Sequence, residues 1–289
     1  MIDLLIQQLA NGLALGMCYA LVALGLTLVF GVLHVINFAH GEFYMLGGAS
    51  VALLSSKAGV PYGYACVAAI LIVCVVAWVV DLVAVKPVLE KKDGITTVLL
   101  TTFAISLLLE HGALGFIGPA PIRVDGLEGS LEVGKILMTW QRVLVIVVGI
   151  VLLCGIELIL RKTLLGKRIR GVAQSAHAAR VVGIRIDAIK TITFVGAAAT
   201  AALAGSLLTP IVLFTPVMGQ HIVISAFVIV VIGGMGNVSG AVICGLLLGA
   251  VESLSSVFLP QELAAAAIYA LLLLTLLVRP QGLFAKGRR

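Results

Sequence analysis

Three polar side chains stand close together in a chain that is otherwise mostly apolar: Asn37, His40 and Glu42. Ionisable groups at membrane depth are energetically costly and usually face a cavity or a partner. Irregular backbone at such a depth must be buried in protein or line water. The motif therefore indicates a pore-lining or gating element. The alternative is an ordinary turn with Glu42 at a helix start, where the helix dipole favours a carboxylate.

A second run of small and polar residues extends from Gly233 to Gly240. Its spacing, G-x-G-x-x-x-G, differs from the dinucleotide-binding fingerprint, and no Rossmann unit surrounds it. The run instead predicts a tight connection between two packed helices. In residues 25–54 and in residues 227–254, a stretch rich in Gly and Asn separates two apolar runs. Such paired interruptions can mark an internal repeat with a transport pathway between the halves. The alternative is that glycine is simply common in membrane helices.

The other ionisable residues of the apolar segments form no recognisable catalytic or metal site. Most lie within a turn or two of a predicted helix end, where anchoring at the membrane interface explains them better than a proton relay does. The sequence contains no H-E-x-x-H motif and no G-x-x-x-x-G-K-[ST] loop. We therefore expect no enzymatic activity, and any ATP must be bound by another polypeptide. The residues concerned are Asp81, Glu110, His111, Glu157, His221 and Glu252.

The composition places these residues on membrane helices. Of 289 residues, 61% are hydrophobic and 11% are charged, and the mean hydropathy is +1.21, whereas a soluble domain carries about 25% charge. Because a membrane helix needs about 20 apolar residues, we predict one all-α domain, 1–289, with nine spans, or eight spans plus a re-entrant element. The candidate segments are 5–30, 42–56, 63–85, 95–113, 139–160, 188–209, 219–235, 239–258 and 262–279.

Two G-x-x-x-G pairs lie in these segments, Gly12 with Gly16 and Gly245 with Gly249. Such spacing lets helix backbones approach closely. We interpret both pairs as packing positions inside the fold rather than as a dimer face. The five cysteines also lie in apolar runs without a C-x-x-C pair, and they are interpreted as small buried side chains.

Basic residues cluster at 86–92, 161–190 and 279–289, which together hold 15 of the 19 Lys and Arg. Because cytoplasmic loops carry an excess of Lys and Arg, we predict that all three clusters are cytoplasmic. The longest other loop, about 114–138, is slightly acidic and is placed outside. The C-terminus is then cytoplasmic and, with nine spans, the N-terminus is outside.

The segment 161–190 holds eight Lys or Arg and one acid. Within it, Ala178 and Ala179 precede Gly183, and this A-A-x-x-x-G spacing gives a helix face of small residues followed by a turn. Such a helix suits a groove in a soluble partner, with arginines for polar contacts. The alternative is an amphipathic helix on anionic lipid. The many small residues and the lack of Trp and Phe favour the partner.

Four stretches together resemble the permease subunits of ABC importers for branched-chain amino acids, and the resemblance covers essentially the whole chain. The stretches are residues 12–48, 166–193, 231–240 and 278–284. The resemblance implies an ABC importer permease fold in the bacterial inner membrane. It also implies a second homologous permease, two cytoplasmic ATPases that bind ATP and Mg, an extracytoplasmic substrate-binding protein, and no cofactor in this chain.

Transport by alternating access follows from the same resemblance. The expected substrates are branched-chain amino acids, although relatives carry urea, short amides or aromatic acids. The alternative is a different class of protein, a secondary transporter or channel that works alone. The sequence argues against it, because no group of charged residues is predicted near the middle of the membrane spans.

The resemblance also implies roles for individual residues. The basic segment is similar to the family's coupling segment, a relative of the E-A-A-x-x-x-G motif, although His177 stands at the Glu position. The implied ATPase-coupling residues are Gly166, Arg170, His177, Ala178, Ala179, Arg180 and Gly183. The implied translocation-path residues are Asn37, His40, Gly41, Glu42, Gly233, Gly234, Gly236 and Asn237.

Overall fold

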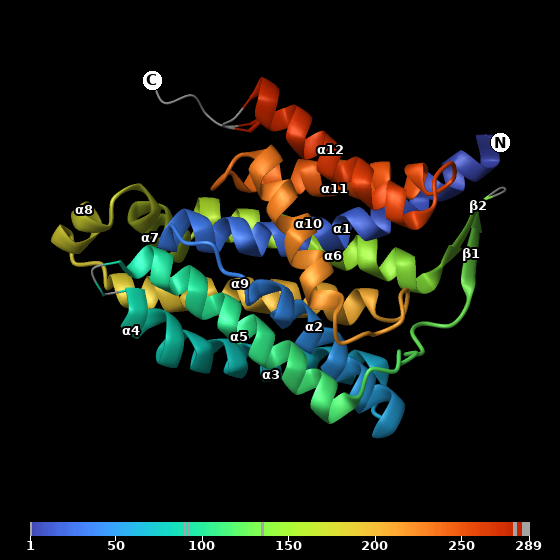
Figure 1. The fold of residues 1–289 in the computed structure, drawn as a ribbon, viewed down its shortest axis with the longest axis horizontal. Helices are drawn as coiled ribbons and strands as arrows, with labels where there is room; N and C mark the ends of the chain where they lie inside the picture. Colours follow the sequence, from blue (N-terminus) through green and yellow to red (C-terminus); the bar gives the residue numbers. More distant parts are fainter. Residues whose placement is uncertain (1, 90, 92, 134–135, 280–281, 285–289) are drawn as a thin grey trace.

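The computed structural model describes residues 2–89, 91, 93–133, 136–279 and 282–284. It is a bundle of helices that run mostly along one direction, with α10 crossing them (Figure 1). The bundle helices are α1 (Ile2–Leu33), α2 (His40–Val51), α3 (Tyr62–Val80), α5 (Gly94–Ile117), α6 (Trp140–Lys162), α9 (Ile186–Leu208), α10 (Met218–Gly233), α11 (Val238–Ser255) and α12 (Gln261–Val278). Helix α2 continues as η1 (Ala52–Lys57), and α3 continues as η2 (Asp81–Val85) and α4 (Lys86–Leu89).

Each of the nine predicted apolar segments forms a helix. Pro61 and Pro260 directly precede α3 and α12, as expected for a residue that favours the start of a helix. Among the described residues, six helices are long and apolar enough to cross a membrane, whereas α10 and the apolar part of α12 are shorter. The total of eight or nine spans and the re-entrant element therefore stay predictions.

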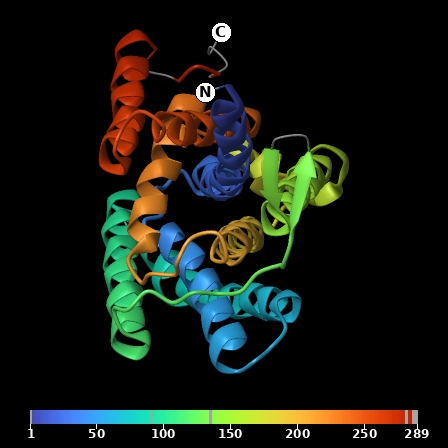
Figure 2. The same cartoon turned by 90° about the vertical axis from the view of Figure 1, so that its right-hand side faces the viewer.

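Helices α1 and α9 form the centre of the bundle. In the apolar 18-residue stretch of each helix, the buried share is 78% for α1 and 67% for α9. The corresponding share for α3, α5 and α6 is only 22% to 28%. Figure 2 shows α1 inside the bundle with α6, α9 and α11 around it. The outer helices turn large apolar side chains outward, such as Val83 and Leu108. This arrangement suits a lipid environment, since water would oppose the exposure of so much apolar surface.

The two G-x-x-x-G pairs pack against each other. A Cβ atom on Gly12 would lie 2.8 Å from the carbonyl oxygen of Gly249, and one on Gly16 would lie 2.9 Å from that of Leu246. Glycine therefore lets α1 and α11 approach backbone to backbone. The interpretation of these pairs as packing positions inside the fold is confirmed.

The two ends of the bundle differ (Figure 1). One end, here the hairpin end, holds the antiparallel strands β1 (Ser130–Val133) and β2 (Ile136–Thr139), which the sequence pattern did not predict. The hairpin is tied to the start of α1, because Gln7 exchanges hydrogen bonds of 2.8 Å and 2.9 Å with the backbone of Leu137. The opposite end, here the basic end, holds α7 (Leu164–Gln174) and α8 (Ala176–Val181). Lys92, Lys135 and the basic tail after Phe284 lie outside the described residues.

Candidate functional site

The chain between α1 and α2 turns back into the bundle. His34 has a φ of 56°, which reverses the chain at the end of α1. Six residues later, the Nε2 atom of His40 lies 3.0 Å from the carbonyl oxygen of Val22. Val22 stands eleven residues before the last residue of α1, Leu33, which is about 16 Å along a helix. Helix α2 therefore starts deep inside the bundle.

The polar residues of this returning segment are buried. Asn37, His40 and Glu42 are each at most 1% exposed. The Oδ1 atom of Asn37 accepts a hydrogen bond from the backbone N–H of Ala39 at 3.1 Å, and the N–H of Phe38 donates to Thr102 on α5 at 3.3 Å. The segment is thus held by its own side chain and by a neighbouring helix, as irregular backbone away from water requires.

Glu42 connects α2 to two other helices. Its Oε1 atom accepts a hydrogen bond from the hydroxyl of Ser106 on α5 at 3.0 Å. Gly219 on α10 packs on the same carboxylate, because a Cβ atom there would lie 2.7 Å from Oε2. One turn beyond Ser106, the Oε2 atom of Glu110 accepts a hydrogen bond from Gln220 at 2.5 Å. Glu42, Ser106, Glu110 and Gln220 form what we call the polar seam of α2, α5 and α10.

Four buried polar atoms near this seam and α1 have no hydrogen-bond partner among the described residues: Thr27 Oγ1, Asn37 Nδ2, His40 Nδ1 and Glu42 Oε2. Unpartnered polar atoms are rare inside proteins, and each one costs free energy. Their clustering in one interrupted segment marks a region where a second arrangement, or a bound molecule, would supply partners.

The polar seam corrects one sequence interpretation. Position in the sequence favours interface anchoring for both Glu110 and His111, but Glu110 is 5% exposed and faces α10, while His111 is exposed. Ser106, Thr102 and Gln220 were not predicted as site residues. The spacing of Ser106 and Glu110, four apart in an apolar helix, was the available signal, because such residues share one helix face.

The glycine run connects α10 to α11, as predicted. Gly234 and Gly236 adopt φ values of 90° and 82°, which favour glycine. Asn237 caps α11, since its Oδ1 atom accepts a hydrogen bond from the N–H of Gly240 at 3.1 Å. Its Nδ2 atom donates to the carbonyl oxygen of Phe284 at 2.6 Å. The C-terminal stretch is thereby fastened to the glycine run.

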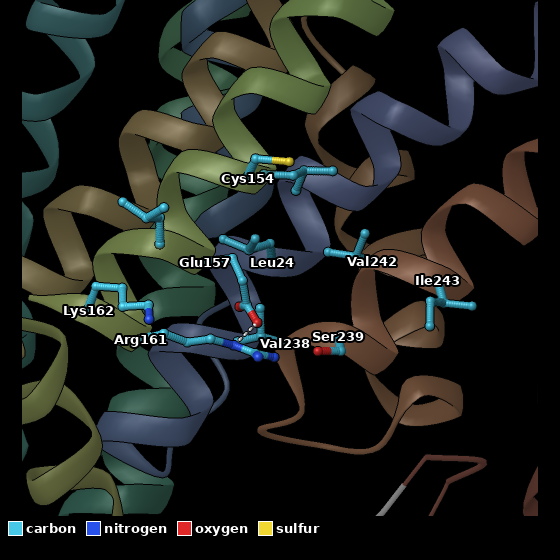
Figure 3. A pocket seen from close by; sticks show the side chains of 11 residues that line it. Leu24, Cys154, Glu157, Arg161, Lys162, Val238, Ser239, Val242 and Ile243 are labelled. Atoms are coloured by element: carbon cyan, nitrogen blue, oxygen red, sulfur yellow. Dashed lines mark ion pairs between the residues drawn. The ribbon is translucent and has the colours of Figure 1, made fainter.

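Two cavities lie beside the glycine run at the basic end. The first, of about 510 Å³, lies between α1, α6 and α11, and Figure 3 shows its apolar wall and the ion pair of Glu157 with Arg161. The second, of about 500 Å³, is lined by Gly236, Asn237 and Arg170 among others. Of the implied path residues, Gly236 and Asn237 therefore line a cavity. The other six are buried: Asn37, His40, Gly41, Glu42, Gly233 and Gly234.

The implied coupling residues form two short capped helices at the basic end. Thr163 caps α7 through a hydrogen bond from the N–H of Gly166 at 3.1 Å, and Ser175 caps α8 through one from the N–H of Ala178 at 3.2 Å. Gly183, with a φ of 80°, follows α8.

Helix α8 is anchored on one side and open on the other. Ala179 is 3% exposed and holds the helix to the bundle, whereas Val181 and Val182 are 78% and 76% exposed. The implied coupling residues on the surface are Arg170, His177, Ala178, Arg180 and Gly183, and those inside are Gly166 and Ala179.

An apolar helical bundle with a helix that starts inside it, and with buried polar groups at that start, has the features of a polytopic membrane transport protein. Residues 8–276 match the family of the branched-chain amino acid transport system permease component, and the chain belongs to this family. The high-affinity branched-chain amino acid transport system permease protein LivH of Escherichia coli K12 is 33% identical, over 97% of this chain and 96% of its own length.

LivH of Salmonella typhimurium shows the same identity and coverage. The corresponding protein BraD of Pseudomonas aeruginosa is 30% identical over the same shares of both chains. No solved structure matched the chain. The family resemblance predicted from the four sequence stretches is confirmed.

Proposed function

We propose that this chain is the membrane-spanning permease subunit of an ATP-driven importer of branched-chain amino acids in the bacterial inner membrane. Family membership supports the transport role, and the relatives are named for branched-chain amino acid transport. The sequence has no P-loop, so ATP and Mg are assigned to two separate cytoplasmic ATPase subunits. A second, homologous permease and an extracytoplasmic substrate-binding protein complete the proposed assembly.

The observation that carries the coupling role is the exposed tip of α8. Its outer face presents Val181 and Val182, and exposed arginines surround them. Exposed apolar residues rimmed by polar ones mark protein interaction sites. A short helix with an apolar tip fits a groove in a partner, and the anchored Ala179 would transmit the partner's movement to the bundle.

The charge distribution supports the orientation. The basic end carries α7 and α8 with their exposed Lys and Arg, and positive charge favours the cytoplasmic side. We therefore place the basic end in the cytoplasm and the hairpin end outside. The N-terminus of α1 then faces outward and the C-terminus faces the cytoplasm.

In the proposed alternating access, ATP closes the partner ATPases, α7 and α8 move, and the bundle helices tilt to release substrate inward. Such tilting would change the surroundings of the buried polar groups in the polar seam. Separation of α2, α5 and α10 would expose Glu42 and Glu110, and would give the unpartnered atoms access to water or substrate.

Substitutions in the coupling segment test this proposal. Gly183→Arg and Ala179→Trp should weaken ATPase association by about 2 kcal/mol, or about thirtyfold, and should abolish ATP-driven leucine uptake while the membrane fold stays intact. Co-purification with the ATPases and uptake into proteoliposomes measure these effects.

Gly59→Arg is the matched control. Gly59 also has a positive φ, 67°, and a Cβ atom there would have no neighbour within 4 Å, as at Gly183, but Gly59 lies at the other end of the bundle. Wild-type ATPase co-purification and uptake in both coupling variants would overturn the assignment.

A further inference from the structure

Two cavities at the hairpin end meet in one cleft, here the hairpin-end cleft. One cavity, of about 640 Å³, is lined by residues from the ends of α1, α6, α9 and α11. The other, of about 630 Å³, reaches from that end to Tyr44 on the interrupted helix α2. Both are lined by Leu15, Leu208, Val212 and Glu252, so they adjoin along these residues. Their sizes lie in the range of small-molecule sites.

Two opposite charges line the cleft without pairing. Glu252 is half-buried at the junction of the two cavities, and the hydroxyl of Tyr19 donates a hydrogen bond to its Oε2 atom at 2.7 Å. Arg142 lines the first cavity, and in the part of the chain that the structure describes it forms no hydrogen bond or ion pair. Charges within a membrane bundle normally face a partner or a pathway.

The rest of the shared wall is aliphatic. Leu15, Leu208 and Val212 belong to both cavities, and Ile211 and Ile222 extend the wall on either side. Leu208 and Ile222 are 4% and 6% exposed. A ligand of this cleft would thus meet one carboxylate, one guanidinium and branched aliphatic side chains, beside the imidazole of His221 and polar side chains such as Asn11 and Ser253.

We propose that the hairpin-end cleft binds a zwitterionic aliphatic α-amino acid inside the permease itself. The ligand's ammonium group would contact Glu252, its carboxylate would contact Arg142, and its side chain would lie on Leu15, Leu208 and Val212. Tyr19 is a positioning residue, because its hydrogen bond fixes the Glu252 carboxylate. The inference rests on the proposed function and adds a substrate site to this chain. Urea lacks both charges, and an aromatic acid lacks the ammonium group.

Equilibrium binding of radiolabelled L-leucine tests the proposal on the purified permease complex, without the soluble binding protein. Binding is measured both without nucleotide and with a non-hydrolysable ATP analogue. The two conditions are needed because the proposed alternating access closes the cleft in one state and opens it in the other. Arg142→Gln and Glu252→Gln should each weaken leucine binding about 10- to 100-fold, as expected for a lost hydrogen bond to a charged group.

Two leucine analogues separate the two contacts. Leucinamide lacks the carboxylate, so Arg142→Gln should reduce the preference for leucine over leucinamide. The acid 4-methylpentanoate lacks the ammonium group, so Glu252→Gln should reduce the preference for leucine over this acid. Lys57→Gln and Glu132→Gln remove the same charges from exposed positions at the same end, which line neither cavity of the cleft, and both should bind leucine as the wild type does.

Absence of leucine binding in both nucleotide states, or wild-type binding in both cleft variants, would overturn the cleft assignment. ATP-driven uptake by the complete system is measured separately in proteoliposomes. Uptake without direct binding to the permease would be consistent with the proposed function but would contradict the proposed amino-acid site in the cleft. Direct binding without ATP-driven uptake would support the cleft and contradict the importer.

Discussion

Glu42 shows how one side chain sets the packing of three helices. Its carboxylate is fully buried, it accepts a hydrogen bond from Ser106, and it occupies the space where a larger residue at position 219 would place its side chain. Nothing larger than glycine fits at position 219 while the carboxylate keeps this position. Glycine at 219 and glutamate at 42 are therefore predicted to depend on each other.

Gly219→Ala should destabilise the fold by about 1–3 kcal/mol, because the added methyl group overpacks the Glu42 carboxylate. The midpoint of thermal unfolding in detergent measures the change. Glu42→Ala in the same chain should recover part of the loss, since it removes the group that the methyl group meets. If the change in stability of the double variant equals the sum of the changes in the two single variants, the direct contact is contradicted.

At the scale of elements, the sequence pattern predicted the nine apolar helices and their order, because apolar runs between polar loops determine both. It could not predict the depth at which α2 begins. Six residues between Leu33 and His40 allow either a surface turn or a return into the bundle, and the contact between His40 and Val22 decides between them. Such contacts join residues far apart in the sequence.

The same limit applies to the site. Glu110 and His111 are neighbours in the chain, yet only Glu110 faces α10, since consecutive helical residues point in different directions. The unpredicted partner, Gln220, lies 110 residues away. The capped coupling helices, in contrast, follow from local signals, because Thr163 and Ser175 stand at the starts of α7 and α8.

The contact of α1 with α11 should be the least tolerant element pair. Gly249→Leu is expected to lower the free energy of unfolding by about 3 kcal/mol or more, because its side chain would meet the backbone of Gly16. Gly196→Leu is the matched control, since Gly196 lies within α9, is exposed and has open space around it. Thermal unfolding in detergent compares the two. A similar loss of stability in both variants would contradict the prediction, because it would show that leucine destabilises each helix by itself and not the contact between α1 and α11.

At the scale of the whole molecule, the bundle has a hollow toward each end and a closed layer between them. The hairpin-end cleft reaches Tyr44, and the second cavity at the basic end reaches Thr27 and Gly31. His40 and Glu42 are buried, and His40 contacts Val22, which lies on α1 between Leu15 at the cleft and Thr27 at the second cavity. The proposed alternating access needs such an arrangement, and the layer between the hollows contains the unpartnered Nδ1 atom of His40 and Oε2 atom of Glu42.

The orientation of the whole molecule can be tested by cysteine labelling. In a chain whose five cysteines are replaced, Glu128→Cys places an exposed thiol near the hairpin end, and Lys167→Cys places one on α7 at the basic end. A membrane-impermeant maleimide added to intact cells should label Glu128→Cys alone, because the basic end is predicted to face the cytoplasm. Permeabilised cells provide the control, since both thiols should then react. Labelling of Lys167→Cys in intact cells, with protection of Glu128→Cys, would reverse the orientation and place α8 out of reach of a cytoplasmic ATPase.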